Sequence, residues 1–361
     1  MAMAAEWKKE ILNTYPELQV ESRNVADEEN GYLQLLGLKN HSGPTSDLAA
    51  IYELFEGKDP QVAKRALEKN AAWVTEVTRI ARLDQRSNHG IADAENYEHM
   101  ARIKQAAETL MLQAWVQASD GDEPAALESM NAASTLIGHL IDLEYPFLLN
   151  ETVAVVICQG QRQVILTNIL TQLGPQADLR AWRQCIERHP PTVERFKRAI
   201  LGEWRQFADV FAAETLFGLH LQRRLVDPHE TATAITRQVI EMSRNLKAGD
   251  LKSMETFCHG LTEPDLSPEG MAWTEGYLHE AWARGYIRAA RMHARSLAAI
   301  DLLILESEQD AIDPSDMKRA TKDPYTGLPF ILDPQERTVS CPGPASVNDA
   351  YGEHEPLKLP W

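Results

Sequence analysis

The stretch that decides the fold runs from Met100 to Ile141 and reads MARIKQAAETLMLQAWVQASDGDEPAALESMNAASTLIGHLI. Its apolar residues recur at intervals of three and four, which places them on one face of a helix. The pattern stops at Ser119–Asp122 and then restarts. Pro124 suits the first turn of a second helix, where no backbone N–H is needed. The stretch therefore predicts an antiparallel helical hairpin.

Helical periodicity continues on both sides of this hairpin, from Asp59 to Gln309. Gly and Pro residues end several of the segments, because Gly accepts a left-handed backbone and Pro cannot continue the helical hydrogen bonds. The segments differ too much in length to form a regular repeat. We predict an all-α fold, an irregular array or bundle of long helical hairpins that is tetratricopeptide-like or solenoid-like. Helices are expected at about 147–173, 176–188, 192–225, 229–247, 250–259 and 268–309.

The composition changes near the C-terminus, where eight of the 19 prolines lie between Pro314 and Pro360. Two β-prone stretches, Phe330–Leu332 and Thr338–Ser340, flank a turn and predict a small β-hairpin. Apolar residues alternate at the very end of the chain, which favours packing of this end on the rest of the protein.

The chain is long enough to bury a large core without disulfides or metal ions. The change in composition divides it into an all-helical domain at 1–310 and a Pro-rich segment at 311–361. We expect the Pro-rich segment, with its hairpin, to pack on the helical body.

The charge balance bears on the class of partner. Hydrophobic residues make up 44% and charged residues 25% of the chain, as in ordinary globular proteins. The formal net charge of −17 repels phosphate backbones and anionic lipids, so we expect neither nucleic acid nor a membrane surface as partner. The longest strongly apolar stretch, Val153–Cys158, is far shorter than the ~18 residues of a membrane span, so we expect no transmembrane segment in this chain.

The four cysteines show no metal-binding or redox spacing, and we expect unpaired thiols and no cofactor. The sequence also lacks the motifs G-x-S-x-G, G-x-x-x-x-G-K-[ST] and G-x-G-x-x-G. Nucleophile-elbow, P-loop and dinucleotide-binding sites therefore have no local support.

Four short stretches carry a resemblance to known proteins. They are ALEKNAA at 66–72, SDGD at 119–122, RAILGEW at 198–204 and DPYTGLPF at 323–330. With them the chain resembles a group of uncharacterised helical proteins of Planctomycetes and related Gram-negative bacteria, usually preceded by a signal or membrane anchor. The last stretch is also similar to the Asp-Pro-x-x-Gly-x-Pro-like segment that precedes a β-hairpin in type II secretion pseudopilins. The resemblance implies an all-α body in a periplasmic or envelope setting, if a leader was removed; the alternative is the cytoplasm.

One group of side chains suggests a metal site. Helical di-iron proteins use Glu and His one turn apart, with carboxylates from facing helices. Glu95, Glu98 and His99 come nearest to this pattern, because Glu95 and His99 are four residues apart on one helix face. Carboxylates of other helices, Glu151, Glu203 and Glu214, are the candidate partners. The alternative interpretation is an acidic first helical turn, which the helix dipole favours.

Basic residues form the other candidate site. Arg284, Arg288, Arg291 and Arg295 follow one another at intervals of four, three and four, so they form a stripe along the last long helix. Guanidinium groups suit carboxylates and phosphates, which predicts a docking surface for an acidic partner segment or an anionic ligand. The alternative is that the stripe faces acidic neighbouring helices or water. A second basic cluster contains Arg180, Arg183, Arg188, Arg195, Lys197, Arg198 and Arg205.

Two functions follow from these observations. Stacked helices offer extended surfaces, and no catalytic motif is visible, so the first hypothesis is a non-enzymatic protein-interaction or scaffold protein of the bacterial cell envelope with an unidentified protein partner. The second hypothesis is a helical metalloenzyme with a carboxylate and His site. The ligand and the oligomeric state stay open.

Overall fold

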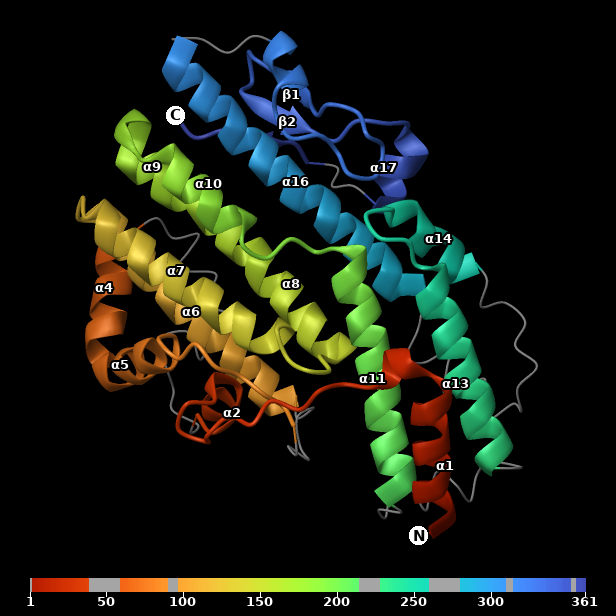
Figure 1. The fold of residues 1–361 in the computed structure, drawn as a ribbon. Coiled ribbons are helices and arrows are strands. Elements are labelled where there is room, and N and C mark those ends of the chain that lie inside the picture. Colours follow the sequence, from red (N-terminus) through yellow and green to blue (C-terminus); the bar gives the residue numbers. More distant parts are fainter. Residues whose placement is uncertain are drawn as a thin grey trace. The chain divides into compact units, whose positions relative to one another are not determined.

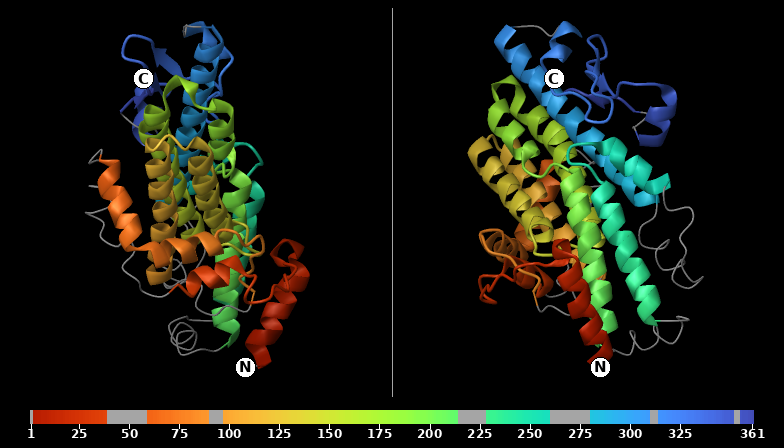
Figure 2. Two further views of the ribbon diagram at one scale, coloured as in Figure 1. Left: turned by 90° about the vertical axis from the view of Figure 1, so that its left-hand side faces the viewer. Right: turned by 45° about the vertical axis from the view of Figure 1, so that its right-hand side comes forward.

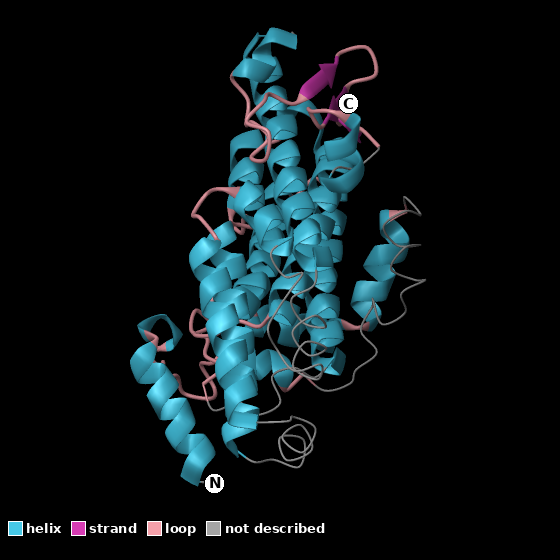
Figure 3. Cartoon of the chain, turned by 90° about the vertical axis from the view of Figure 1, so that its right-hand side faces the viewer, coloured by secondary structure: helices cyan, strands magenta, loops and turns pink. Residues whose placement is uncertain are grey.

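The computed structural model describes residues 2–38, 59–89, 97–213, 228–259, 280–309, 314–351 and 355–361. Helices dominate these ranges, and the strands are short (Figure 3). The all-α prediction with a small C-terminal hairpin is therefore confirmed. The chain divides into two compact units, of which unit 1 contains Met1–Ser22, Glu144–Glu151 and Thr192–Ile287. Unit 2 contains Arg23–Leu143, Thr152–Pro191 and Arg288–Trp361.

The core of unit 2 is the hairpin that the sequence predicts. Helix α6 (Tyr97–Ser119) and helix α7 (Glu123–Ile141) lie side by side (Figure 1). Gly121 has a φ of +81° in the turn, where an L side chain would be strained. Asp122 then begins α7, because its carboxylate accepts a hydrogen bond from the backbone N–H of Ala125 at 3.1 Å. Met100, Ile103 and Leu110 of α6 are buried, and so are Met130, Ile137 and Ile141 of α7.

Further helices complete unit 2. Helix α8 (Leu148–Gln163) continues through a π-helical turn at Val164–Ile169 to Leu173, and a 3₁₀ turn at Gly174–Gln176 follows. The predicted end of this helix at about 173 is confirmed, since α9 (Leu170–Leu173) ends there and Gly174 has a φ of +72°. The other α-helices described in this unit, besides most of α8 and α16, are α2 (Gly31–Leu36), α4 (Pro60–Lys69), α5 (Ala71–Ile80), α9 (Leu170–Leu173), α10 (Leu179–Glu187) and α17 (Ala345–Tyr351).

The run Leu148–Gln176 is, among the described helices, the one long and apolar enough to cross a membrane by length and composition. Within its most apolar window 56% is buried inside the protein. A core helix of a globular protein meets the same criterion, so the run is weak evidence for a membrane span. Its residue Arg162 is buried and hydrogen-bonds the His293 ring at 3.2 Å, as in a protein core.

Unit 1 is built on α1 (Ala2–Thr14), α11 (Val193–Ala213) and α13 (Pro228–Asn245), with α14 (Leu251–His259) after them (Figure 2). Two indoles hold the three long helices together. Trp7 of α1 donates a hydrogen bond to Thr233 of α13, and Trp204 of α11 donates to Thr236, at 3.1 and 2.8 Å. The ring centroids of Trp7 and Trp204 are 6.5 Å apart, so both indoles are packed and satisfied.

Two helices contribute residues to both units. Helix α8 (Leu148–Gln163) begins in unit 1, where the carboxylate of Glu203 accepts the backbone N–H of Leu148 at 2.6 Å. Helix α16 (Glu280–Gln309) begins in unit 1 and continues into unit 2. The predicted continuation of two helices, at 214–225 and 268–279, lies outside the described residues.

The Pro-rich segment contains the predicted hairpin. A short 3₁₀-helix at Pro314–Lys318 comes first, and then β1 (Ile331–Asp333) pairs antiparallel with β2 (Thr338–Ser340). A third, unpredicted strand, β3 (Leu357–Lys358), pairs antiparallel with β2, which gives the order β1-β2-β3. This segment belongs to unit 2 together with the end of α16, so the division into units does not follow the predicted boundary at 310.

Candidate functional site

The four arginines of α16 do not form one exposed stripe. Arg284 and Arg288 are exposed, whereas Arg291 and Arg295 are buried, with exposed fractions of 0% and 5%. Helical periodicity places all four on one side of the helix, but the Pro-rich segment covers the C-terminal pair. The prediction of a continuous solvated docking surface therefore needs correction: half of the stripe lies inside the fold.

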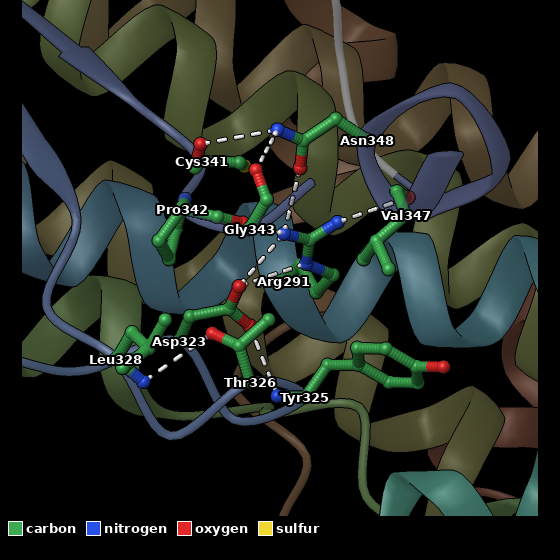
Figure 4. A network of polar contacts seen from close by, with 10 residues as sticks. All are labelled: Arg291, Asp323, Tyr325, Thr326, Leu328, Cys341, Pro342, Gly343, Val347 and Asn348. Carbon is green, nitrogen blue, oxygen red and sulfur yellow. Dashed lines mark hydrogen bonds and ion pairs between the residues drawn. The ribbon is translucent and has the colours of Figure 1, made fainter. Parts of the chain in front are cut away.

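Arg291 is the centre of a buried network (Figure 4). Its Nε and Nη2 donate to one carboxylate oxygen of Asp323, at 3.0 and 2.8 Å. Nη2 also reaches the Pro342 carbonyl at 2.9 Å and the Asn348 side-chain oxygen at 3.0 Å, and Nη1 reaches the Val347 carbonyl at 3.4 Å. One guanidinium thus joins three separate parts of the Pro-rich segment to α16.

Asp323 is held in turn by a tight turn of the chain. Its backbone N–H donates to the Leu328 carbonyl, its carbonyl accepts from Gly327, and its second carboxylate oxygen accepts from Tyr325 at 2.9 Å. Gly327 has a φ of +72°, which Gly adopts without strain. The segment Asp-Pro-Tyr-Thr-Gly therefore serves as a closed turn that presents one carboxylate to Arg291 (Figure 4).

Arg295 has a similar structural environment. Its Nη1 donates to the carbonyl of Glu355 at 2.9 Å, which attaches the last residues of the chain to α16. The arginines that were candidates for binding a partner therefore divide into two that hold the Pro-rich segment and two, Arg284 and Arg288, that face solvent.

The candidate metal site is described only in part. Glu95 and the side chain of Glu98 lie outside the described residues, and His99 is half-buried in α6. Of the candidate partners, Glu214 is also outside them. The described residues contain no group of three His, Cys, Asp or Glu side chains that could hold a metal ion.

The other two candidate partners of that metal site, Glu151 and Glu203, form other contacts. Glu151 is 2% exposed and forms an ion pair with Arg195 at 2.6 Å, and it accepts a hydrogen bond from Tyr286 at 3.4 Å. Glu203 accepts from the first residue of α8. Both carboxylates therefore position helices of unit 1.

One buried thiol, that of Cys185, is not activated. Cys185 lies beside Ser134 and Gln161, with the sulfur 3.8 and 3.7 Å from their polar atoms. Burial raises the pKa of the Cys185 thiol to about 11, so very little thiolate exists at neutral pH. Cys158 and Cys341 are buried as well.

The second basic cluster is divided between the two units. In unit 2, Arg183 contacts Asp301 at 2.6 Å and Arg180 contacts Glu308 at 2.9 Å, so both are neutralised by α16. In unit 1, Arg195 is paired with Glu151, as described above. Arg205 differs, because none of its described contacts is to a carboxylate: it donates to the Leu18 carbonyl at 3.2 Å and lies over the Tyr145 ring.

Arg205 borders a solvent-open hollow of unit 1 with a volume of about 450 Å³. Among the described residues, the lining contains three cationic side chains and no carboxylate. Two of those cations, Lys8 and Lys9, belong to α1 and were not singled out in the sequence, because nothing local links them to Arg205. The lining residues are Lys8, Lys9, Leu12, Asn13, Gln19, Val20 and Arg205.

No family model, curated protein or solved structure matches this chain. The resemblance to helical envelope proteins and to the pseudopilin segment therefore stays a prediction.

Proposed function

We propose that the protein is a non-enzymatic interaction or scaffold protein of the bacterial cell envelope. The observation that supports this proposal is that the buried ion pairs of the protein position its structural elements. Arg291 with Asp323, and Arg195 with Glu151, join elements that are distant in the sequence and do not border the one described hollow. Charged groups of this kind fix the relative position of helices, and a fixed helical body presents an extended surface to partners.

Arg288 is the residue of unit 2 that this proposal assigns to the partner contact. It is exposed on α16, and it lies within one turn of Arg291. A cation that protrudes from a protein with a net charge of −17 attracts a carboxylate-rich segment locally, although the whole molecule repels it. The partner is expected to present acidic side chains.

Site-specific photo-crosslinking in cells of the source organism tests the proposal. A photoreactive residue at position 288 is expected to give one discrete adduct with a second protein. The same residue at Lys69, which is exposed on α4 of the same unit, is the control and is expected to give none. Equal labelling from both positions, or no adduct from position 288, contradicts the assignment of Arg288.

Two further measurements bear on the rest of the proposal. Metal analysis of the purified protein distinguishes the scaffold hypothesis from the metalloenzyme hypothesis. A stoichiometric transition metal would favour the metalloenzyme. Cell fractionation tests the envelope setting, which the resemblance implies. Recovery of the protein from the cytoplasm alone would contradict that part.

A further inference from the structure

One helical surface of unit 2 has no charged side chain. The range 152–177 contains a single charged residue, Arg162, although charged residues make up 25% of the whole chain. Arg162 is buried, so the surface of this run is uncharged. By contrast, the exposed positions of α13 include Arg237, Glu241 and Arg244. Depletion of charged residues is the compositional signal of the core of a protein–protein interface.

The exposed residues of this run form a stripe along one side of α8 and α9. Val156, Gln163, Thr167 and Thr171 are exposed, and Gly160 lies half-buried among them, at intervals of four, three, four and four. We call these five residues the uncharged stripe. Its apolar member, Val156, is 42% exposed. The stripe crosses the π-helical turn that joins α8 to α9 (Figure 1), and π turns within helices occur frequently at functional sites.

Gly160 leaves an open space in the stripe. A Cβ atom at this position would have nothing within 4 Å, so no close packing inside the described chain requires a glycine here. Glycine in a helix interior costs about 0.5–1 kcal/mol relative to alanine. A glycine also lets another backbone come close, which the fold of one chain does not use at this position. The contact that makes use of Gly160 is therefore expected to come from outside the chain.

The chemistry of the stripe suits a second copy of the same chain. In a contact with twofold symmetry one patch faces the same patch of the partner, so the patch must be complementary to itself. Amide and hydroxyl groups both donate and accept hydrogen bonds, so the side chains of Gln163, Thr167 and Thr171 meet this condition. Two copies with a net charge of −17 each repel one another, and the stripe lets them touch without placing like charges in contact.

We propose that the uncharged stripe joins two copies of this chain about a twofold axis, with Gly160 near the point where the two α8 helices cross. The uncharged range is about 35–40 Å long and about 10 Å wide, so each copy buries roughly a few hundred Å². An interface of this size is smaller than that of a stable complex, so the dimer is weak and reversible. The stripe does not include Arg288, and the proposal does not depend on the scaffold function.

Sedimentation equilibrium of the full chain at several concentrations tests the dimer. The wild type is expected to show a reversible equilibrium between monomer and dimer with a Kd on the order of 100 μM. The double variant V156E/Q163E brings carboxylates of the two copies together and is expected to raise the Kd by at least about tenfold. Both side chains are exposed, so the fold is expected to persist, and thermal melting of the variant checks this.

Helix α4 of the same unit provides the matched control. Its Val62 is 44% exposed, close to the value for Val156, and the neighbouring Gln61 is exposed as well. The variant Q61E/V62E therefore makes the same two replacements and adds the same charge outside the stripe. Its Kd is expected to stay within about twofold of the wild type in 0.15 M salt, because distant charges are screened.

A mixture of two variants shows whether the stripe faces its own copy. V156K/Q163K alone is expected to be as weak a dimer as V156E/Q163E, since like charges again meet. An equimolar mixture of the two is expected to form a mixed dimer, because opposite charges then face each other. Damage to the fold of either variant would not produce this recovery.

Three results overturn the proposal: a wild type that stays monomeric up to about 1 mM, equal weakening by Q61E/V62E and V156E/Q163E, or absence of the mixed dimer. A monomeric wild type that binds vesicles of phosphatidylcholine, and loses this binding in V156E/Q163E, also overturns it and would mean that lipid covers the stripe. None of these results bears on the crosslinking at position 288, so the two proposals fail separately.

Discussion

The guanidinium of Arg291 and the carboxylate of Asp323 form an ion pair of 2.8 Å in which neither side chain has any exposure to solvent. A buried pair of this kind gains little net stability over apolar residues, because both charges must leave water. Removal of one partner is strongly destabilising, since the other charge then stays buried without a counter-charge. The pair therefore makes the attachment of the Pro-rich segment to α16 highly sensitive to substitution at either residue.

Asp323→Asn is expected to lower the free energy of unfolding by about 3–5 kcal/mol, the range for breaking a buried ion pair from one side. The substitution keeps the shape of the side chain and removes its charge, and Arg291 is left buried. Urea unfolding followed by circular dichroism measures the change. Arg288→Gln, on an exposed residue of the same helix, is the control and is expected to change the free energy by less than about 0.5 kcal/mol.

The double variant R291M/D323N sharpens this test. With both charges gone, it is expected to be more stable than Asp323→Asn alone, because no uncompensated charge is buried. If Asp323→Asn costs no more than Arg288→Gln, the ion pair does not hold the segment, and Arg291 returns as a candidate for binding a partner.

The end of the chain is expected to contribute to stability as well. Leu357–Lys358 pairs with β2, the N–H of Leu359 donates to the Arg337 carbonyl at 2.8 Å, and Leu359 is buried. Deletion of residues 355–361 removes these contacts and the Arg295 hydrogen bond to Glu355. The expected loss is on the order of 1–2 kcal/mol after chain entropy is subtracted, which lowers the Tm by a few degrees.

Limited proteolysis gives an independent measurement of the same segment. Residues 355–361 are expected to resist trimming under conditions that keep the body intact. Trp361→Ala is the comparison variant, because that side chain is exposed and its removal is expected to leave the Tm unchanged. Fast trimming with an unaltered melting curve would show that the segment is not part of the folded unit.

A buried histidine, His139, is expected to make the stability of the folded protein depend on pH. His139 packs directly on Gly31, and its Nε2 lies 3.3 Å from the Ile80 carbonyl, to which it donates. Its Nδ1 has no hydrogen-bond partner in the part of the chain that the structure describes, so protonation there would bury an unsatisfied N–H. Burial, with a contribution from Arg86, lowers the pKa of His139 from 6.5 to about 4.

The sign of the effect follows from this lowered pKa. The unfolded state takes up the proton at higher pH than the folded state, so the folded state loses stability as pH falls from about 6.5 to about 4. The expected contribution is on the order of 3 kcal/mol over that range, and it is fully present above pH 6.5. The free energy of unfolding is measured against pH for the wild type and for His139→Gln, and the difference between the two curves gives the contribution of His139. Identical slopes for the two proteins would contradict the prediction.

Local patterns account for what the sequence predicts well. The α6–α7 hairpin is encoded by apolar spacing, Gly121, Asp122 and Pro124, which all act within a few residues of one another. The hairpin at 331–340 follows from two β-prone stretches and a turn. Strand β3 is only two residues long, and it forms because β2 offers an edge. The alternation of apolar residues at the end of the chain predicts packing of this end but not its pairing with β2.

The candidate sites show the limit of such patterns. Periodicity gives the direction in which Arg291 points, but its partner Asp323 is 32 positions away in a segment without periodicity. The hollow combines α1 with Arg205, and 187 positions separate Leu18 from Arg205. A contact of this kind depends on tertiary packing, and a single sequence carries no signal for it.

Two glycines in helices predict opposite effects of the same substitution. Gly202 of α11 allows a close approach to the chain before α8: a Cβ atom there would lie 2.1 Å from the carbonyl oxygen of Pro146. Gly160 of α8 has nothing within 4 Å of such an atom. Gly202→Ala therefore forces the backbone apart and is expected to destabilise the protein by about 1–3 kcal/mol or more. Gly160→Ala is expected to stabilise it by about 0.5–1 kcal/mol, because Ala loses less backbone entropy in a helix.

Urea unfolding of both variants measures the two changes. The close contact also positions Glu203, which follows Gly202 and accepts the N–H of Leu148 at 2.6 Å. Gly202→Ala is therefore expected to loosen the start of α8, seen as faster amide hydrogen exchange at Leu148, while exchange in α6 and α7 stays unchanged. A Gly202→Ala variant as stable as Gly160→Ala would mean that α11 does not approach Pro146 this closely, and the contact of Glu203 with the start of α8 would have to be revised.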